Sequence, residues 1–213
     1  MKKVFLSILA ILFTLKLVAQ CPHLKFMGIP LDGKISAFNK EMQKKGFTLD
    51  KQLSKAMEGV HIYNGNFAGE RGQVFISFDD KTKIVYLAGV LIKHYTKQSA
   101  IKGYEDMRDM LEEKYSQDDD VRYFENMKNE RGEQLKEQGI TPFEWKQTSE
   151  EEGYEATTFI IPNLESRSII GDIKVFLSES YSNVSYTTEY NLYIRYTDWQ
   201  NDKSQRENRM DDL

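Results

Sequence analysis

Apolar residues recur with the 3.6-residue spacing of an amphipathic helix in three segments of the chain. The first, Lys34 to Lys45, carries Ile35, Phe38 and Met42 on one face, and Gly46 follows it as a predicted C-terminal cap. The second, Thr96 to Tyr115, has one apolar stripe that contains Ala100, Tyr104, Met107, Leu111 and Tyr115. The third, Val121 to Gln138, is highly polar, so we expect a helix that packs lightly.

The spacing changes to two from Gly59 onward, which is typical of strands. Strands are predicted over Val60 to Tyr63, Gln73 to Phe78 and Lys83 to Lys93, with a turn at Asn64 to Asn66 after the first. Four later segments are enriched in β-branched or aromatic residues and predict further strands: Phe143 to Lys146, Tyr154 to Ile161, Ile170 to Leu177 and Glu189 to Tyr196.

Strands that follow strands indicate an antiparallel sheet. We therefore predict an α+β fold, in which a three-strand meander and four later strands pack with two to three helices. Residues 21–213 form a single domain in this interpretation, with a half-domain break near 116–122 and a frayed polar tail at 199–213. Pro22 to Gly33 is predicted to be irregular, and Asp50 to Glu58 is either a short helix or a loop.

Residues 1–20 have the pattern of a secretory signal peptide. Lys2 and Lys3 precede a twelve-residue apolar stretch from Val4 to Leu15. As a helix this stretch rises about 18 Å, too little for a hydrocarbon core of about 30 Å. The sequence therefore predicts a periplasmic or secreted protein. Cys21 stands where a bacterial lipoprotein carries its acylated cysteine, which leaves a membrane-anchored lipoprotein as the alternative.

The charge of the chain argues against two classes of partner. The 213 residues carry a formal net charge of −4, and without the three lysines of the signal the balance is 26 basic to 33 acidic residues, or −7. A negative chain is a poor ligand for nucleic acid or for an anionic membrane surface. The longest apolar run after the signal is Ile84 to Ile92, so we expect no transmembrane segment in the mature chain and a membrane tether only if Cys21 is lipidated.

No catalytic, metal or cofactor motif is evident, and we expect no cofactor. The three histidines (His23, His61 and His94) and the lone Cys21 lack the spacing of a zinc site or a nucleophile pair. The glycine-rich run from Gly65 to Gly72 joins two strands and does not open a helix, so it is not a phosphate loop. A carboxylate pair for hydrolysis is recognised only in space, and the sequence leaves that chemistry open.

Aromatic residues near the C-terminus are the best candidates for a binding site. On the last predicted strand, Tyr193 and Arg195 alternate with apolar residues that would face the core, and Trp199 follows the strand. Exposed tyrosines of this kind anchor protein partners or stack on sugars. The alternative is ordinary packing at a sheet edge. Tyr193, Arg195 and Trp199 are therefore predicted to contact an unknown protein or glycan partner.

Short motifs resemble those of small exported, uncharacterised proteins of gut Bacteroidota. They are the Ile-Pro-Leu-x-Gly lead into a helix within Met27 to Phe47, a glycine-bounded hairpin, a helix that ends Glu-Lys-Tyr, and the closing Tyr196-x-Asp198-x-x-Asn201. The helix-plus-meander order is similar to β-lactamase-inhibitor-like domains, and this resemblance implies protein binding through a concave sheet. The favoured function is a non-enzymatic exported envelope protein that binds through a sheet face. The alternatives are an exported hydrolase with Asp/Glu chemistry and a lipid-anchored envelope assembly protein.

Overall fold

The computed structural model describes residues 22–139, 141–182 and 186–210, and Cys21 therefore lies outside it. The helices are α2 (Ile35–Lys44), α3 (Lys51–Ala56), α4 (Lys97–Ser116), α5 (Asp119–Glu137) and α6 (Trp199–Met210). The strands are β1 (Lys25–Phe26), β2 (Ile29–Pro30), β3 (Thr48–Asp50), β4 (Val60–Phe67), β5 (Glu70–Phe78), β6 (Val85–His94), β7 (Lys146–Glu151), β8 (Tyr154–Asn163), β9 (Ser168–Ser182) and β10 (Thr187–Asp198).

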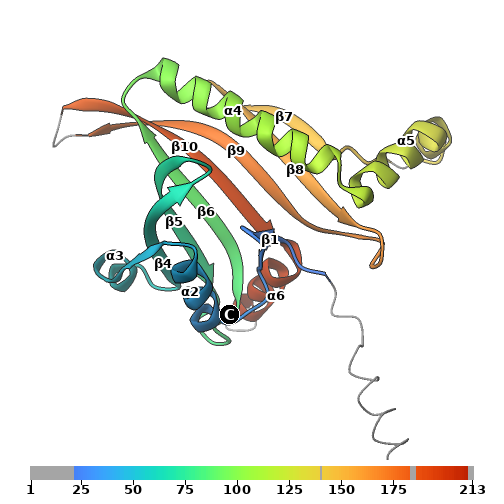
Figure 1. The fold of residues 1–213 in the computed structure, drawn as a ribbon. Helices are drawn as coiled ribbons and strands as arrows, with labels where there is room; N and C mark the ends of the chain where they lie inside the picture. The colour runs from blue at the N-terminus through green and yellow to red at the C-terminus, as the bar shows by residue number, and fades with distance from the viewer. Residues whose placement is uncertain (1–21, 140, 183–185, 211–213) are drawn as a thin grey trace, which may run out of the picture.

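An antiparallel sheet of eight strands, in the order β3-β4-β5-β6-β10-β9-β8-β7, dominates the fold (Figure 1). It confirms the predicted α+β class. Two meanders meet at its centre, where β6 and β10 pair from Tyr190↔His94 to Thr197↔Leu87. The predicted break near 116–122 coincides with the junction of α4 and α5, and the halves on either side of it share this one sheet.

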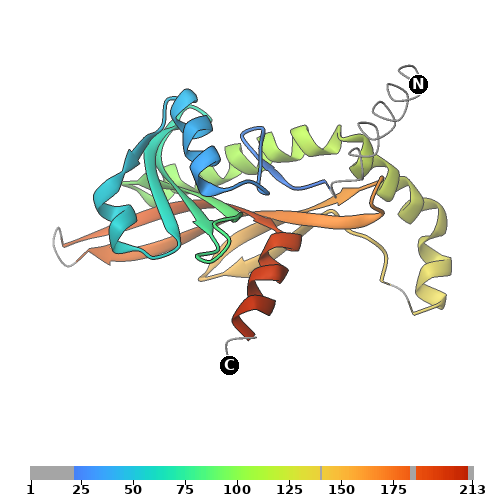
Figure 2. The ribbon, with the colours of Figure 1, turned by 90° about the horizontal axis from the view of Figure 1, so that it is seen from below.

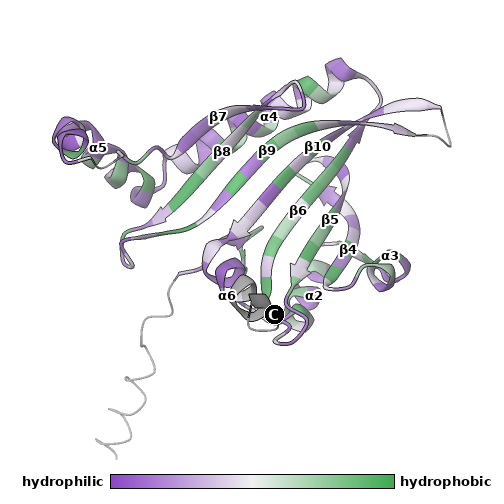
Figure 3. Cartoon of the chain, turned by 180° about the vertical axis from the view of Figure 1, so that it is seen from behind, coloured by the Kyte–Doolittle hydropathy of each residue, from purple (hydrophilic) through white to green (hydrophobic). Residues whose placement is uncertain are grey.

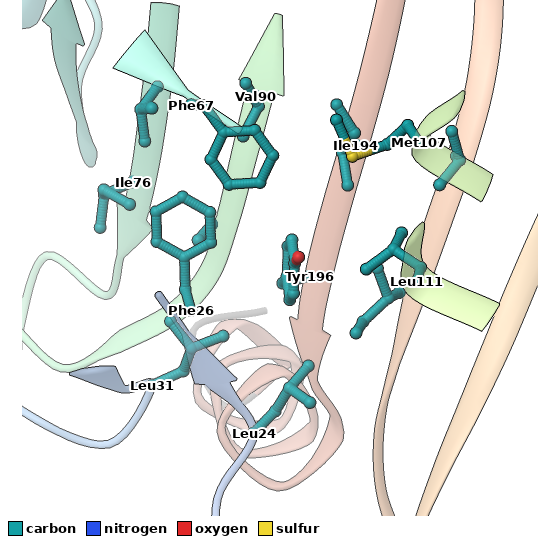
Figure 4. Close-up of a cluster of buried hydrophobic side chains, with 14 of the residues drawn as sticks. Leu24, Phe26, Leu31, Phe67, Ile76, Val90, Met107, Leu111, Ile194 and Tyr196 are labelled. Atoms are coloured by element: carbon teal, nitrogen blue, oxygen red, sulfur yellow. The ribbon is translucent and has the colours of Figure 1, made fainter. Parts of the chain in front are cut away.

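The core lies between one face of the sheet and a layer made of α2, α4 and the small β1–β2 sheet (Figure 2). The stripe predicted for α4 is buried in full. The β1–β2 hairpin packs on the same face of the sheet as α4. Its Phe26 stacks on Phe67, with ring centres 5.7 Å apart, and meets the ring of Tyr196 edge-on at 5.2 Å (Figure 4). The N-terminal segment, predicted to be irregular, therefore forms a tight hairpin that supplies core residues.

The predicted turn at Asn64 to Asn66 is wrong, because β4 continues to Phe67. The turn lies at Ala68 and Gly69, which both have positive φ. Gly65 has a different role: a Cβ on it would lie 2.4 Å from the Phe47 ring, so this glycine lets an aromatic ring pack directly on the strand.

The predictions for β7 and for the C-terminal tail are also wrong. The edge strand begins at Lys146, where the predicted strand ends, and continues through polar residues to Glu151. The aromatic residue Phe143 lies outside it and packs on Phe124 of α5. The tail forms α6, whose polar sequence gives no hydrophobic period. Side-chain hydrogen bonds hold it: Asn201 Nδ2 donates to the carbonyl oxygen of Leu31 at 2.6 Å.

The remaining helix predictions agree with the structure. Gly46 follows α2 with a φ of +85°, the left-handed conformation expected of a C-terminal cap. The segment left open between helix and loop forms α3, whose first turn is capped by the Asp50 carboxylate. In α5 only Val121 is buried, which agrees with the light packing predicted for that helix. Within the described residues, no helix combines the length and apolar character needed to cross a membrane.

The carboxyl group of Asp198 joins the two ends of the described chain. It is fully buried. Its Oδ2 accepts the Leu24 N–H at 2.9 Å and lies 3.0 Å from His23 Nδ1, while Oδ1 accepts the Asn201 N–H at 3.0 Å. The hydrogen bond with Asp198 raises the pKa of His23 above its usual 6.5, although burial acts in the opposite direction.

We predict that His23→Ala destabilises the protein more at acid than at alkaline pH. A raised pKa means that the folded state favours the protonated ring, so its contribution is complete below the usual pKa of 6.5 and disappears as the pH rises through the folded-state value. The expected loss near pH 5.5 is about 1.5–3 kcal/mol, the range for a hydrogen bond to a charged group. Urea unfolding of wild type and variant at several pH values measures it.

His61→Ala is the matched control, because burial lowers the pKa of His61. The cost of that substitution should shrink toward acid pH, the opposite direction. Parallel pH dependences for the two variants would contradict the assignment.

Candidate binding surface

The sheet face opposite α4 carries the residues predicted to bind a partner. On β10, Leu192, Ile194 and Tyr196 are buried in the core. Successive side chains of a strand point to opposite faces, so Tyr193 and Arg195 project from the other side. We call that side the open face, since no helix lies across the middle of its strands (Figure 3). Its central side chains are half-buried: Phe75, Leu87, Leu91, Asp172, Lys174, Phe176, Tyr193 and Arg195.

An aromatic pair lies in the middle of the open face. Tyr193 of β10 and Phe176 of β9 are cross-strand partners, with ring centres 5.0 Å apart and planes 9° from parallel. This separation is close to the spacing of neighbouring strands, so the rings stand upright with their faces toward each other. Their outer edges, together with the neighbouring Leu91 of β6, form an apolar band across three strands.

A second aromatic ring lies flat on the sheet. A Cβ on Gly89 would lie 2.0 Å from two carbon atoms of the Phe75 ring, which shows that this ring covers the glycine. Gly89 also pairs with Arg195 on its other side. The glycine therefore makes room for Phe75 beside the Arg195 position.

Polar groups occupy one end of the open face, beside the start of α6. Trp199 is 41% exposed, and its Nε1–H donates to Asp172 Oδ2 at 2.5 Å. Burial raises the pKa of Asp172, although the hydrogen bond from Trp199 lowers it. Lys174 contacts Glu151 of the edge strand. Among the described residues, Asp172 Oδ1 and Arg195 Nε are buried without a hydrogen-bond partner.

The other end of the open face is hollowed. A shallow cavity of about 270 Å³ is lined by Asn64, Arg71, Gly72, Gln73, Leu91 and Lys93. Two amide and two cationic side chains surround it, and Leu91 connects it to the apolar band.

The structure thus brings Tyr193, Arg195 and Trp199 to one surface. It adds Phe75, Leu91, Phe176 and Arg71, which the sequence analysis did not select. Each of these four residues lies on a strand at a position whose side chain alternates with the core-facing ones, so strand alternation could have found them. The sequence did not reveal that β10 pairs with β6, and this pairing brings the residues of β5 and β6 beside those of β9 and β10.

Two of the three histidines make local hydrogen bonds, whereas Nε2 of His94 is buried without a hydrogen-bond partner among the described residues. His61 Nδ1 lies 3.0 Å from Asn39 Oδ1, and His23 belongs to the Asp198 cluster. Across the described ranges, no three His, Cys, Asp or Glu side chains converge as candidate metal ligands.

Comparison of the chain with protein-family models, curated proteins and solved structures finds no match. The predicted resemblances to exported Bacteroidota proteins and to β-lactamase-inhibitor-like domains therefore stay predictions. The candidate surface rests on its geometry alone.

We predict that Gly89→Ala costs about 1–3 kcal/mol of stability, because the new methyl group must displace the Phe75 ring. Gly132→Ala in α5 is the control, since no atom lies within 4 Å of its Cβ position. That substitution should stabilise the helix by about 0.5–1 kcal/mol. Chemical unfolding of both variants measures the difference, and equal effects would refute the close approach of Phe75 to the strand.

Proposed function

We propose that this protein is a non-enzymatic binding protein that takes another protein on its open face. One observation carries the proposal: helices cover one face of the eight-stranded sheet, whereas the other face presents half-buried apolar and aromatic side chains on four adjacent strands. Contiguous exposed apolar surface of this kind marks interaction sites. Tyrosine, tryptophan and arginine, the residue types that dominate binding energies at interfaces, all occur there.

The arrangement of the aromatic rings supports a protein partner over a glycan. A sugar stacks on the flat face of an aromatic ring. The faces of Tyr193 and Phe176 are turned toward each other, which leaves Phe75 as the one ring of these three that lies flat on the sheet. The edges of the two paired rings and the side chains of Leu87 and Leu91 form an uneven apolar surface, and protein side chains can pack against it. A glycan remains the second outcome of the tests below.

The hydrolase alternative stays a prediction, and one observation bears on it. Burial raises the pKa of Asp172, and the charge of Asp202 acts in the same direction. Raised carboxyl pKa values occur at acid–base sites and also in structural clusters. Turnover of a peptide or glycan substrate that is abolished by Asp172→Asn would overturn the binding proposal.

We further propose that binding takes place outside the cytoplasm, on the strength of the signal-like pattern in residues 1–20. Protein purified from the cells that make it should have the mass of a chain that begins near Gln20 or Cys21, or that mass plus acyl chains on Cys21. Intact-mass spectrometry distinguishes the two. A chain that retains Met1 to Ala19 would contradict export.

The binding proposal predicts where a partner can be crosslinked. With a photoreactive amino acid in place of Leu91, on the open face, irradiation of living cells should give a protease-sensitive adduct of defined mass. The same amino acid in place of Met110, exposed on α4, should not give it. Equal adducts from both positions, or adducts resistant to protease but sensitive to glycosidase, would contradict a protein partner on this face.

A substitution then tests the energetic role of the aromatic pair. Tyr193→Ser should weaken the interaction by about 2 kcal/mol, roughly 30-fold, as expected of an interface anchor. Tyr123→Ser removes an exposed tyrosine from α5 and should leave binding unchanged. Circular dichroism and unfolding curves control for a loss of fold.

A further inference from the structure

The central strands of the open face carry more cationic than acidic side chains, unlike the molecule as a whole. The chain has a formal net charge of −4. From strands β5, β6, β9 and β10, however, the open face projects four cationic side chains and two acidic ones. The cationic ones are Arg71, Lys93, Lys174 and Arg195, and the acidic ones are Asp172 and Glu189. The centre of the open face therefore carries more positive than negative charge, and Glu151 of β7 and Asp50 of β3 lie at its margins.

Two of these cations have no ion pair within the described residues. Lys93 pairs with Glu189 at 2.7 Å, and Lys174 contacts Glu151. Arg71, exposed beside the hollow, and Arg195, half-buried in the centre, have no carboxylate within ion-pair distance among the described residues. Arg195 does interact at longer range with Asp172, whose pKa its charge lowers. The buried Nε of Arg195 also has no hydrogen-bond acceptor. Because this Nε is buried, a partner would reach the two terminal nitrogens of the half-buried guanidinium, which can pair with an anionic acceptor through two parallel hydrogen bonds.

We propose that the partner docks through an acidic segment whose carboxylates pair with Arg71 and Arg195 and whose apolar side chain packs on Leu91. This inference rests on the proposed function and specifies the chemistry of the partner. Complementary charge at the edges of an apolar patch fixes the orientation of a bound chain and excludes partners of the wrong sign.

The register of the strands sets the spacing of the acidic residues. Gln73 pairs with Leu91, and Leu91 pairs with Tyr193. Arg71 lies two residues before Gln73, and Arg195 lies two residues after Tyr193. Arg71, Leu91 and Arg195 therefore form a diagonal across β5, β6 and β10, with the leucine at its midpoint.

Two residues along a strand span about 6.7 Å and neighbouring strands are about 4.8 Å apart, so the diagonal from Arg71 to Arg195 is about 16 Å long. An extended chain covers that distance in about five residues. Because the side chains of an extended chain alternate, residues that face the sheet together lie an even number of positions apart. The docking segment thus has two acidic residues four positions apart, with an apolar residue midway between them.

Three fluorescein-labelled peptides test the inference against the full chain by fluorescence anisotropy. The first is Gly-Glu-Thr-Leu-Val-Glu-Ser-Gly, whose glutamates and leucine share one face of the extended chain, and the others replace both glutamates by glutamine or by lysine. At low salt the glutamate peptide should bind at least about 10-fold more tightly than either analogue, and the difference should shrink as salt screens the charges.

Arg71→Gln and Arg195→Gln should each weaken binding of the glutamate peptide by about 5-fold or more. Arg131→Gln, which removes the same charge from an exposed position of α5, should not. Unfolding curves of all three variants separate a loss of binding from a loss of fold.

The other outcomes are decisive as well. Equal binding of the glutamate and glutamine peptides would overturn the acidic segment but leave an apolar binding face, and so the proposed function, intact. The acidic segment would also be overturned if no peptide bound at millimolar concentration, or if an adduct at Leu91 mapped to a basic segment of the partner. Binding of polygalacturonate in place of the peptide, lost in Arg195→Gln, would replace the protein partner by an acidic glycan. Absence of any adduct at Leu91 is the separate result that removes the proposed function itself.

Discussion

The buried carboxylate of Asp198 is the interaction on which the rest of the structure depends. It is the last residue of β10, it caps the first turn of α6, and it holds His23 and the backbone of Leu24. A buried charge is tolerated only where hydrogen bonds replace its hydration, and three donor groups do so here. One residue thereby fixes the position of the N-terminal hairpin, of the central strand and of the C-terminal helix.

This cluster also positions the candidate surface. Trp199 follows Asp198 directly, and its indole nitrogen reaches Asp172 on the open face. On the opposite side, the segment held at Leu24 leads to Phe26, which packs against Tyr196 on the same strand that presents Tyr193 and Arg195. The two faces of β10 are thus stabilised by one set of contacts, and the side chains proposed to bind a partner lie on the central strand of the sheet.

The regular parts of the fold could be predicted because a single periodicity determines them. The stripe of α4 and the alternation of β5 and β6 are repeated patterns that one sequence displays. The wrong predictions of turns and strands occur where one residue type is compatible with two different structural roles. Gly65 carries a turn signal although it accommodates the Phe47 ring, and Phe143 has the residue type of a strand although it packs on α5. Helix α6 was missed because a buried cap and hydrogen bonds, not an apolar face, hold it.

The candidate surface could be predicted in part for the same reason. Alternation along one strand selected Tyr193 and Arg195, since their neighbours are apolar. Phe75, Leu91 and Arg71 could not be added, because their place beside β10 depends on a pairing between residues about a hundred positions apart. Registers of that kind follow from the packing of the whole chain, and no local pattern encodes them.

The strand order has a consequence for how the chain reaches this structure. The C-terminal strand of the described chain, β10, lies at the centre of the sheet, where it joins the meander β3-β4-β5-β6 to the meander β9-β8-β7. Contacts over so long a sequence separation form slowly, because the intervening chain must first lose much of its freedom. Until β10 arrives, the edge of β6 is unpaired and the carboxylate that secures the N-terminus is absent. The native state is therefore available only to a chain that is present through Asp198, and shorter nascent forms have two half-sheets with no centre.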